Sequence, residues 1–367
     1  VGASGALPVN KGKEPTEGKE FDGVTTLINW APTNGNLILK NIELTGAASD
    51  CLSSGSGKRK QIIQLHNVHM HHCGHHIWMH GWEPAGSWDD EVYVEESLFH
   101  HAGLTHNVYI DRIAKATFVR IKAFSPRLLH AFKCVAIECN LISSHISNAS
   151  LDGSWDTDNS HWTHPKRQIG YLGTAPLSLV ACQHGMMFDN KIVFRYGPSE
   201  RTGGYVATRQ PRHDIFGCDQ PPYGSDQFQS SDFWQAVRND SIDLSSIAQS
   251  PHFMVMRWSD NEVLVRREED KGPVHMLLNN GTVPLKASEP GSTRLVYIDK
   301  PDEWLERSID LLANNCFEGF RGEDALFLSR PWGAMVDPPE QDPNPSRRIL
   351  EIGGNECGKQ FELPDWF

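Results

Sequence analysis

The sequence predicts an all-β protein whose short parallel strands follow one another around successive coils, a β-solenoid. The first observation is an internal repeat of 24 to 30 residues, and the second is an alternation of apolar and polar residues over five to eight positions in each repeat. Helical solenoids need apolar residues at a spacing of about 3.6. A propeller needs four strands in every 40 or so residues, about 40 to 50 per blade. The repeats fit a parallel β-solenoid better than either.

The repeats are clearest between residues 37 and 146. HMHHCG from His69 and LFHHAG from Leu98 align without a gap, 29 residues apart. His106-Asn-Val-Tyr109 and His130-Ala-Phe-Lys133 align at an offset of 24, and His76-Ile-Trp-Met79 extends that column 30 residues earlier. Strand-like segments that carry these repeats begin at Leu37, Ile62, Val92, Thr117 and Val135.

The remaining segments are expected to extend or cover the coils. Residues 1–36 form an N-terminal extension or cap, and residues 37–290 form the coils, with a long loop excursion at about 199–251 that is rich in Pro, Gly, Asp, Gln and Ser. Residues 301–318 have the one convincing helical pattern, with Trp304, Ile309, Leu311 and Leu312 on its apolar side. Residues 291–367 should therefore form a C-terminal helix and an extended tail that pack on the solenoid.

Composition narrows the classes of function. The 34 basic and 46 acidic residues give a net charge of −12, which disfavours nucleic acid and anionic lipid as partners. No run of about 18 apolar residues predicts a membrane span. The eight cysteines include no CxxC pair, which removes support for zinc ribbons and thioredoxin-like sites, while an even number permits disulfides. The chain starts at Val1, as a mature protein does after loss of a signal peptide, so we expect a secreted, periplasmic or cell-surface protein.

Stacking of coils turns the sequence alignment into predicted contacts. Equivalent positions of successive coils lie about 4.8 Å apart in a parallel β-solenoid. His106 should therefore lie beside His130, and Tyr109 beside Lys133. A phenol and an ammonium at this separation can form a proton-transfer pair, although such columns also serve as purely structural ladders.

Charge favours a functional interpretation of this region. Residues 111–133 hold six basic residues and one acid, Asp111, which is a local charge of +5 (6 − 1). This predicts a cationic strip that suits an acidic polymer. The alternative is a solvated face balanced by acids of neighbouring coils, such as Glu95 and Glu96. The basic residues are Arg112, Lys115, Arg120, Lys122, Arg127 and Lys133.

These segments resemble a known family. HAGLTHNVYIDRI, followed one coil later by HAFKCVAIECNLI and further on by LLNNGTV, is similar to right-handed parallel β-helix polysaccharide lyases of the alginate-lyase type. In those proteins a His-Asn-x-Tyr segment precedes a His-x-x-Lys segment by one coil. The resemblance covers residues 35–195, and more loosely extends to 285. It departs at Cys134 and Val135, where the family commonly has Ser-Arg, and no acidic residue near 176–182 matches the family's usual acid.

The resemblance implies β-elimination on a uronate-containing polysaccharide. Lys133, with a pKa lowered by burial and cationic neighbours, would be the base, and Tyr109 would protonate the leaving oxygen, or the two roles would be exchanged. Arg112 or His106 would neutralise the substrate carboxylate. No cofactor is required for this reaction. The expected substrate-binding residues are His130, Arg120, Lys122, Arg127 and Asn107.

The histidine-rich stretch from His66 to His80 suggests a second site. Stacking would place His71 on His100 and His72 on His101, and such imidazoles bind zinc or copper. Structural or sugar-stacking histidines are the alternative. LDGSWDTDNS resembles a calcium loop in composition, but it lacks the EF-hand Gly and terminal Glu, so a solvated turn is favoured. Its acids are Asp152, Asp156 and Asp158.

Two rival functions remain open. Paired carboxylates such as Asp89 and Asp90 would support glycoside hydrolysis. A non-catalytic carbohydrate-binding surface protein is the other possibility, and exposed strand edges at the solenoid ends would then allow homo-oligomers or end-to-end filaments.

Overall fold

The computed structural model describes the chain in segments that run from residue 9 to the C-terminus. Everything said below about the structure refers to these segments. The described residues are 9–11, 25–30, 35–54, 60–80, 90–157, 171–180, 182, 184–197, 205–210, 243–249, 254–277, 285–287, 295–297, 308–322, 325–328 and 349–367.

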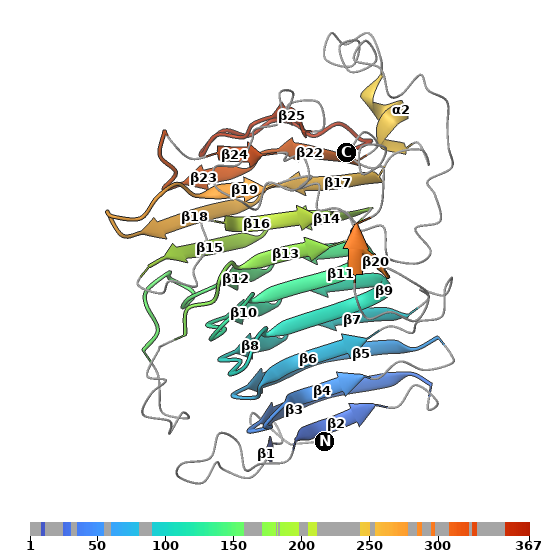
Figure 1. Ribbon diagram of the computed structural model, residues 1–367. Helices are drawn as coiled ribbons and strands as arrows, with labels where there is room; N and C mark the ends of the chain where they lie inside the picture. The colour runs from blue at the N-terminus through green and yellow to red at the C-terminus, as the bar shows by residue number, and fades with distance from the viewer. Residues whose placement is uncertain are drawn as a thin grey trace.

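The fold is a parallel β-solenoid, which confirms the predicted class. Its 23 strands form one continuous parallel sheet, and the colour in Figure 1 advances steadily from the blue N-terminal coils to the red C-terminal ones. Each coil contributes strands to three faces, because each strand pairs with its counterpart one coil earlier and one coil later. We name these faces I, II and III.

Strands that belong to one face follow each other up the stack. Face I contains β2 (Thr26–Trp30), β4 (Asp50–Ser54), β6 (His75–His80), the first halves of β9 (Val108–Val119) and β11 (Phe132–Ile142), β13 (Leu177–Val180), β16 (Tyr205–Gln210), β19 (His275–Leu277) and β24 (Ala325–Leu328). Face II contains the first halves of β3 (Leu37–Thr45) and β5 (Ile62–His71), β7 (Glu91–Glu95), the second halves of β9 and β11, β14 (His184–Phe188), β17 (Met254–Ser259), β22 (Ser308–Ala313) and β25 (Ile349–Gly353). Face III contains β1 (Val9–Lys11), the ends of β3 and β5, β8 (Leu98–His100), β10 (Lys122–Phe124), β12 (His145–Ser147), β15 (Lys191–Tyr196), β18 (Glu262–Arg267) and β23 (Cys316–Glu318).

Two elements lie outside these faces. The strands β20 (Leu285–Ala287) and β21 (Leu295–Tyr297) form an antiparallel pair. The helix α2 (Leu244–Gln249) is six residues long. Among the described residues, no helix has the length and hydropathy needed to cross a bilayer.

Alternation along each strand builds the core. In β5, Ile63, Leu65, Val68 and Met70 are buried, and the residues between them are partly or fully exposed. Successive side chains of a strand point to opposite sides of a sheet, so the apolar set turns inward and the polar set turns outward. The inward residues of successive coils form one continuous apolar core.

The corner between faces II and III sets the register. One residue per coil has a positive φ there, at Asn41, Asn67, Glu96, Arg120, Ser143, Asp189, Asp260 and Asn314. The next residue points inward, and in the later coils it is an asparagine that bonds to the same residue of the next coil. The Asn190 Nδ2 donates to Asn261 Oδ1 over 2.9 Å, and Asn261 Nδ2 donates to Asn315 Oδ1 over 2.8 Å. We call these residues, with Asn355, the asparagine ladder.

The corner between faces III and I has the same left-handed backbone but different side chains. Gly46, His72, His101 and Ser125 have positive φ values there. Histidine adopts this conformation more readily than most residues other than glycine, asparagine and aspartate. The pairs Cys51–Cys73 and Cys316–Cys357 form disulfides, each of which joins two neighbouring coils or the C-terminal tail to a coil.

The helix predicted over 301–318 is wrong for the part that the structure describes. Residues 308–313 and 316–318 form β22 and β23, and residues 301–307 lie outside the described residues. Ile309 and Leu311 face outward into a small apolar cluster with Trp366 and Phe367, while Leu312 faces the main core. A strand buried on both sides has a continuous apolar run, which periodicity cannot distinguish from a buried helix.

The predicted limits of the coils also change. The strands β1 and β2 pair with β3 and β4, so residues that we expected in an N-terminal cap belong to the stack. β16 lies inside the expected excursion of 199–251 but pairs with β13 and β19, and the stack continues past residue 290 to β25. The tail after β25 does pack on the solenoid, through Trp366 and Phe367.

We predict that Asn261→Ala lowers the free energy of unfolding by about 2 kcal/mol or more. The substitution leaves the Asn190 amide and the Met187 carbonyl without a buried partner, and each such group costs about 1 to 3 kcal/mol. The measurement is the urea midpoint at constant m-value. As a matched control, Asn140→Ala removes an outward-facing amide bonded to Thr117 and Glu138, and a loss as large there would contradict the role of the ladder.

Candidate functional site

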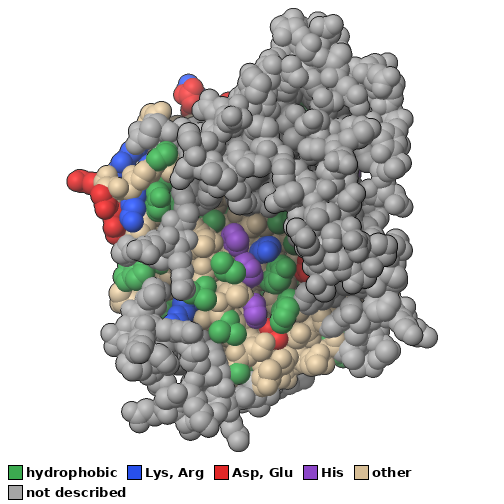
Figure 2. All heavy atoms as spheres, in the orientation of Figure 1, with side chains coloured by type: hydrophobic (Ala, Val, Ile, Leu, Met, Phe, Trp, Pro, Cys, Tyr) green, Lys and Arg blue, Asp and Glu red, His purple; other side chains and the backbone are tan. Residues whose placement is uncertain are grey.

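A row of aromatic and basic side chains crosses face I on its outer side. Trp78 of β6 is opposite Tyr109 of β9, which is opposite Lys133 of β11, which is opposite Ser178 of β13. Val108, Ile110, Phe132 and Cys134, which flank them, point into the core, so this row points outward. We call Trp78, Tyr109 and Lys133 the Tyr–Lys row. Figure 2 shows His, Lys and apolar side chains gathered on one face of the molecule.

The predicted contact between Tyr109 and Lys133 is confirmed. The Nζ of Lys133 lies 4.7 Å from the centroid of the Tyr109 ring, which is a cation–π contact. Tyr109 also packs against Val135, Val180 and Ile137, an apolar cluster on the outer side of the sheet. Both side chains are partly buried. The ammonium and the phenol are therefore held together on one surface beside an apolar patch.

A row of histidines runs beside the Tyr–Lys row. The predicted neighbours His106 and His130 stack with ring centroids 5.0 Å apart, and the His130 backbone N–H donates to His106 Nδ1 over 3.0 Å. His75 precedes His106 by the same 31 residues that separate Trp78 from Tyr109, so it is the next member of the row. Its Nδ1 lies 3.0 Å from Asp50 Oδ1. The predicted His76 column is thus confirmed with a shift of one residue, and Trp78 rather than Met79 meets Tyr109.

Burial keeps the central pair of this row neutral. Burial, reinforced by Lys133, lowers the pKa of His130 to about 3. Burial, followed by the proximity of His130 and Lys133, also lowers the pKa of His106 well below its usual range. Because one nitrogen of a neutral imidazole donates and the other accepts, His106 accepts at Nδ1 and carries its proton at Nε2. Neutral His106 therefore positions His130 and is a poor counter-ion for a carboxylate.

The expected cationic strip does not form one groove. Arg120 pairs with Glu95 and Glu96 of the preceding coil, at the corner between faces II and III. Lys115 pairs with Glu138 over 2.7 Å on face II, and Lys122 is exposed at the start of a face III strand. The alternative of a solvated face balanced by neighbouring acids is correct for Arg120. Cations that are close in sequence point to different faces, and stacking brings acids to them.

Two other expected site residues have structural surroundings. Asn107 is fully buried, and its amide bonds to the backbone of Ala102, Phe99 and Phe124, so it holds a turn and cannot reach a polysaccharide. Arg127 is also buried. Arg112 is the extra residue of a β-bulge in β9, and its side chain lies outside what the structure describes.

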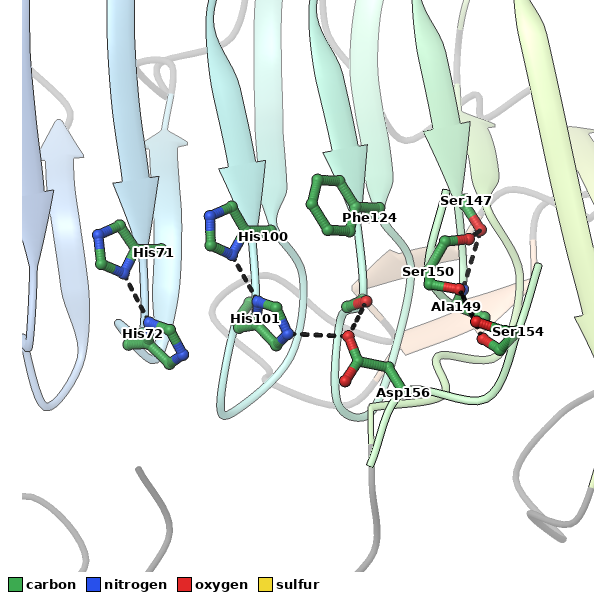
Figure 3. Close-up of polar contacts among 12 residues, drawn as sticks. His71, His72, His100, His101, Phe124, Ser147, Ala149, Ser150, Ser154 and Asp156 are labelled. Carbon is green, nitrogen blue, oxygen red and sulfur yellow. Dashed lines mark hydrogen bonds and ion pairs between the residues drawn. The ribbon is translucent and has the colours of Figure 1, made fainter. Parts of the chain in front are cut away.

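A second cluster of histidines lies where face III turns to face I. The predicted stacking is confirmed, with His71 over His100 at 5.1 Å and His72 over His101 at 5.0 Å, both nearly coplanar. Figure 3 shows the two pairs side by side on successive coils, with Phe124 above His100 on the following coil. We call His71, His72, His100 and His101 the imidazole ladder. Burial, followed by the neighbouring His101, lowers the pKa of His100 to about 2.

The sequence missed two members of this cluster. Glu43 is opposite His69 in β3 and β5, and their ligand atoms and that of His71 all lie within 4.8 Å of one another. Alignment of LILKNIELT with IIQLHNVHMH at an offset of 26 residues would have paired them. His72 and His101, which we expected to bind a metal, stand at the corner behind His71 and His100 and bond to them through Nδ1.

The remaining acidic candidates have separate partners. Asp152 bonds to Ser150 and Ser154 within its own turn, whereas Asp156 accepts from His101 and Ser125, so the two do not share a calcium site. Asp158 lies outside the described residues. Asp90 is buried and bonds to the backbone and amide of Gln61, and Asp89 lies outside the described residues, so this pair does not support glycoside hydrolysis.

Three cysteines form a compact group inside the core. The sulfur atoms of Cys134, Cys139 and Cys182 lie within 4.8 Å of one another, and all three side chains are buried. Burial raises the pKa of the Cys134 and Cys139 thiols well above the usual range. Protonated thiols in an apolar core are weak nucleophiles, so the group behaves as part of the packing.

Comparison with known proteins adds no relative. No protein-family model, curated protein or solved structure matches the chain.

We predict that His130→Gln weakens the dependence of stability on pH between about 6.5 and 3. The folded pKa of His130 lies below that of the unfolded chain, so the unfolded chain binds more protons in this range and wild-type stability falls as the pH falls. Glutamine cannot titrate and removes that contribution. The measurement is the thermal midpoint of both proteins across the range, and equal slopes would contradict the prediction.

Proposed function

We propose that the protein is an exported polysaccharide lyase that cleaves a uronate-containing polysaccharide by β-elimination at the Tyr–Lys row. The contact of Lys133 with Tyr109, beside a neutral histidine pair on an outward surface, carries this proposal. The resemblance of HNVY and HAFK to the β-helical lyases of the alginate-lyase type supports the same assignment.

The reaction needs two proton transfers and a charge partner. One of Tyr109 and Lys133 takes the proton from the carbon next to the substrate carboxylate, and its electron pair forms a double bond to the neighbouring carbon. The glycosidic oxygen leaves that carbon and receives a proton from the other residue. We assign the neutral imidazole of His130 as a hydrogen-bond donor to the carboxylate, and His106 as the residue that positions it.

Recognition of the polymer then depends less on a basic strip than the sequence suggested. Lys115 and Arg120 pair with acids, which leaves them less charge to offer to a polyanion. Trp78 and Tyr109 present aromatic rings on adjacent coils, and aromatic faces stack against sugars. We propose that a sugar chain lies across the coils along this row.

Right-handed coiling and export belong to the same proposal. Connections between parallel strands of one sheet are right-handed in nearly all proteins. Two disulfides, Cys51–Cys73 and Cys316–Cys357, favour an oxidising compartment.

A non-catalytic carbohydrate-binding protein is the second candidate. The observation that favours it is the same aromatic pair, Trp78 and Tyr109, which binds sugars without any chemistry. Binding to an acidic polysaccharide without formation of the unsaturated product would select this function over the lyase.

We predict that Tyr109→Phe and Lys133→Met each lower turnover by about 10²- to 10⁴-fold, the usual contribution of acid–base catalysis. The double variant should lose little more than either single variant, because the two groups act as one unit. The assay is the ultraviolet absorbance of the unsaturated uronate product across a panel of acidic polysaccharides.

The matched control is Lys115→Ala, which removes a lysine of the same strand that points to face II and pairs with Glu138. Its turnover should stay close to wild type. Full activity in Lys133→Met would refute the proposed chemistry, and reducing ends that appear without the absorbance would indicate hydrolysis.

A further inference from the structure

Four potential ligands converge on the outer side of face III. Glu43 Oε1 lies 2.9 Å from His71 Nε2, and His69 Nε2 lies 2.8 Å from His100 Nε2. We propose that Glu43, His69, His71 and His100 bind one transition-metal ion of the class that prefers imidazole, represented by Zn²⁺. This site is on a different face from the Tyr–Lys row and does not depend on the proposed reaction.

Hydrogen bonds fix the orientation of His100. Asp156 Oδ2 accepts from His101 Nε2 over 2.9 Å and from Ser125 Oγ over 2.7 Å, so His101 carries its proton on Nε2. Neutral His101 then presents a lone pair at Nδ1, which faces His100 Nδ1. His100 must donate there, and its Nε2 lone pair therefore points at His69. Figure 3 shows this chain from Asp156 through His101 to His100.

His71 is oriented from its other side. Its Nδ1 lies 2.6 Å from His72 Nδ1 and 3.2 Å from Thr45 Oγ1, and both groups can accept a proton from it. Nε2 is then available beside the Glu43 carboxylate. A ligating imidazole usually has its second nitrogen held by such a partner, because that partner fixes the tautomer and the ring orientation.

The spacing and the atom types suit a tetrahedral ion. Zinc lies about 2.0 to 2.1 Å from imidazole nitrogens, so two of them in a tetrahedral site are about 3.4 Å apart. The separation of 2.8 Å between His69 and His100 needs a shift of less than about 1 Å to reach this geometry. Three nitrogens and one carboxylate oxygen favour zinc or copper over calcium and magnesium, which prefer oxygen ligands.

The four ligands come from three successive coils. Glu43 lies in β3, His69 and His71 lie in β5, and His100 lies in β8. An ion bound to all of them would tie these coils together outside the core. Because it would bind the folded chain and not the unfolded one, it would raise the unfolding midpoint with metal concentration.

The experiment is calorimetric titration of Zn²⁺ into chelator-treated protein. We expect one ion per chain, and at least a 10-fold loss of affinity in Glu43→Gln, His69→Gln and His100→Gln, because losing even an outer partner costs about 10- to 100-fold. The matched control is His66→Gln, which removes a histidine paired with Glu95 on face II and should keep wild-type affinity. Circular dichroism checks that each variant is folded.

A second variant tests the outer partner. Asp156→Asn keeps the shape of the side chain but weakens its hold on His101, so it should lower zinc affinity by about 10- to 100-fold without touching a ligand. Absence of stoichiometric binding would overturn the proposal, and the stacked imidazoles would then be a structural ladder. Binding that survives His69→Gln and His100→Gln but fails in Cys139→Ser or His130→Gln would also overturn it, by locating the ion elsewhere.

Discussion

The register between coils is the constraint on which every site in this protein depends. It is held at the corner between faces II and III, where a residue with positive φ is followed by an inward polar side chain that bonds to the next coil. A slip of one residue would turn the apolar side chains outward and leave buried amides without partners. With the register fixed, His106 meets His130, Tyr109 meets Lys133 and His71 meets His100.

Stacking also explains the electrostatics of the histidines. Rings of equal type about 5 Å apart share a partly buried surface, and both burial and a neighbouring cation or histidine oppose protonation. The stacked imidazoles are therefore neutral at pH 7 despite their number. Neutral imidazoles act as hydrogen-bond donors, acceptors and metal ligands, which are the roles that we propose for the two clusters.

The same stacking removes the cationic strip that the charge count suggested. Arg120 and Lys115 are only five residues apart in the chain, yet they lie at a corner and on a face, and each meets an acid of a neighbouring coil. Charge summed along a window measures neighbours in sequence, whereas the field at a surface depends on neighbours in space. In a solenoid the two differ, because each coil crosses all three faces.

The sequence by itself determined the solenoid, the order of its strands and the stacked pairs, because alternation and a repeat of 24 to 31 residues can be aligned without coordinates. It misjudged residues 308–318, since Ile309 and Leu311 are covered by Trp366 and Phe367 from the C-terminal tail, and a strand buried on both sides resembles a helix. Only the tertiary structure decided that Asn107 is buried, that Arg120 is paired, and that Glu43 joins His69 and His71. Each of these outcomes depends on which face a side chain reaches and on what the next coil presents there.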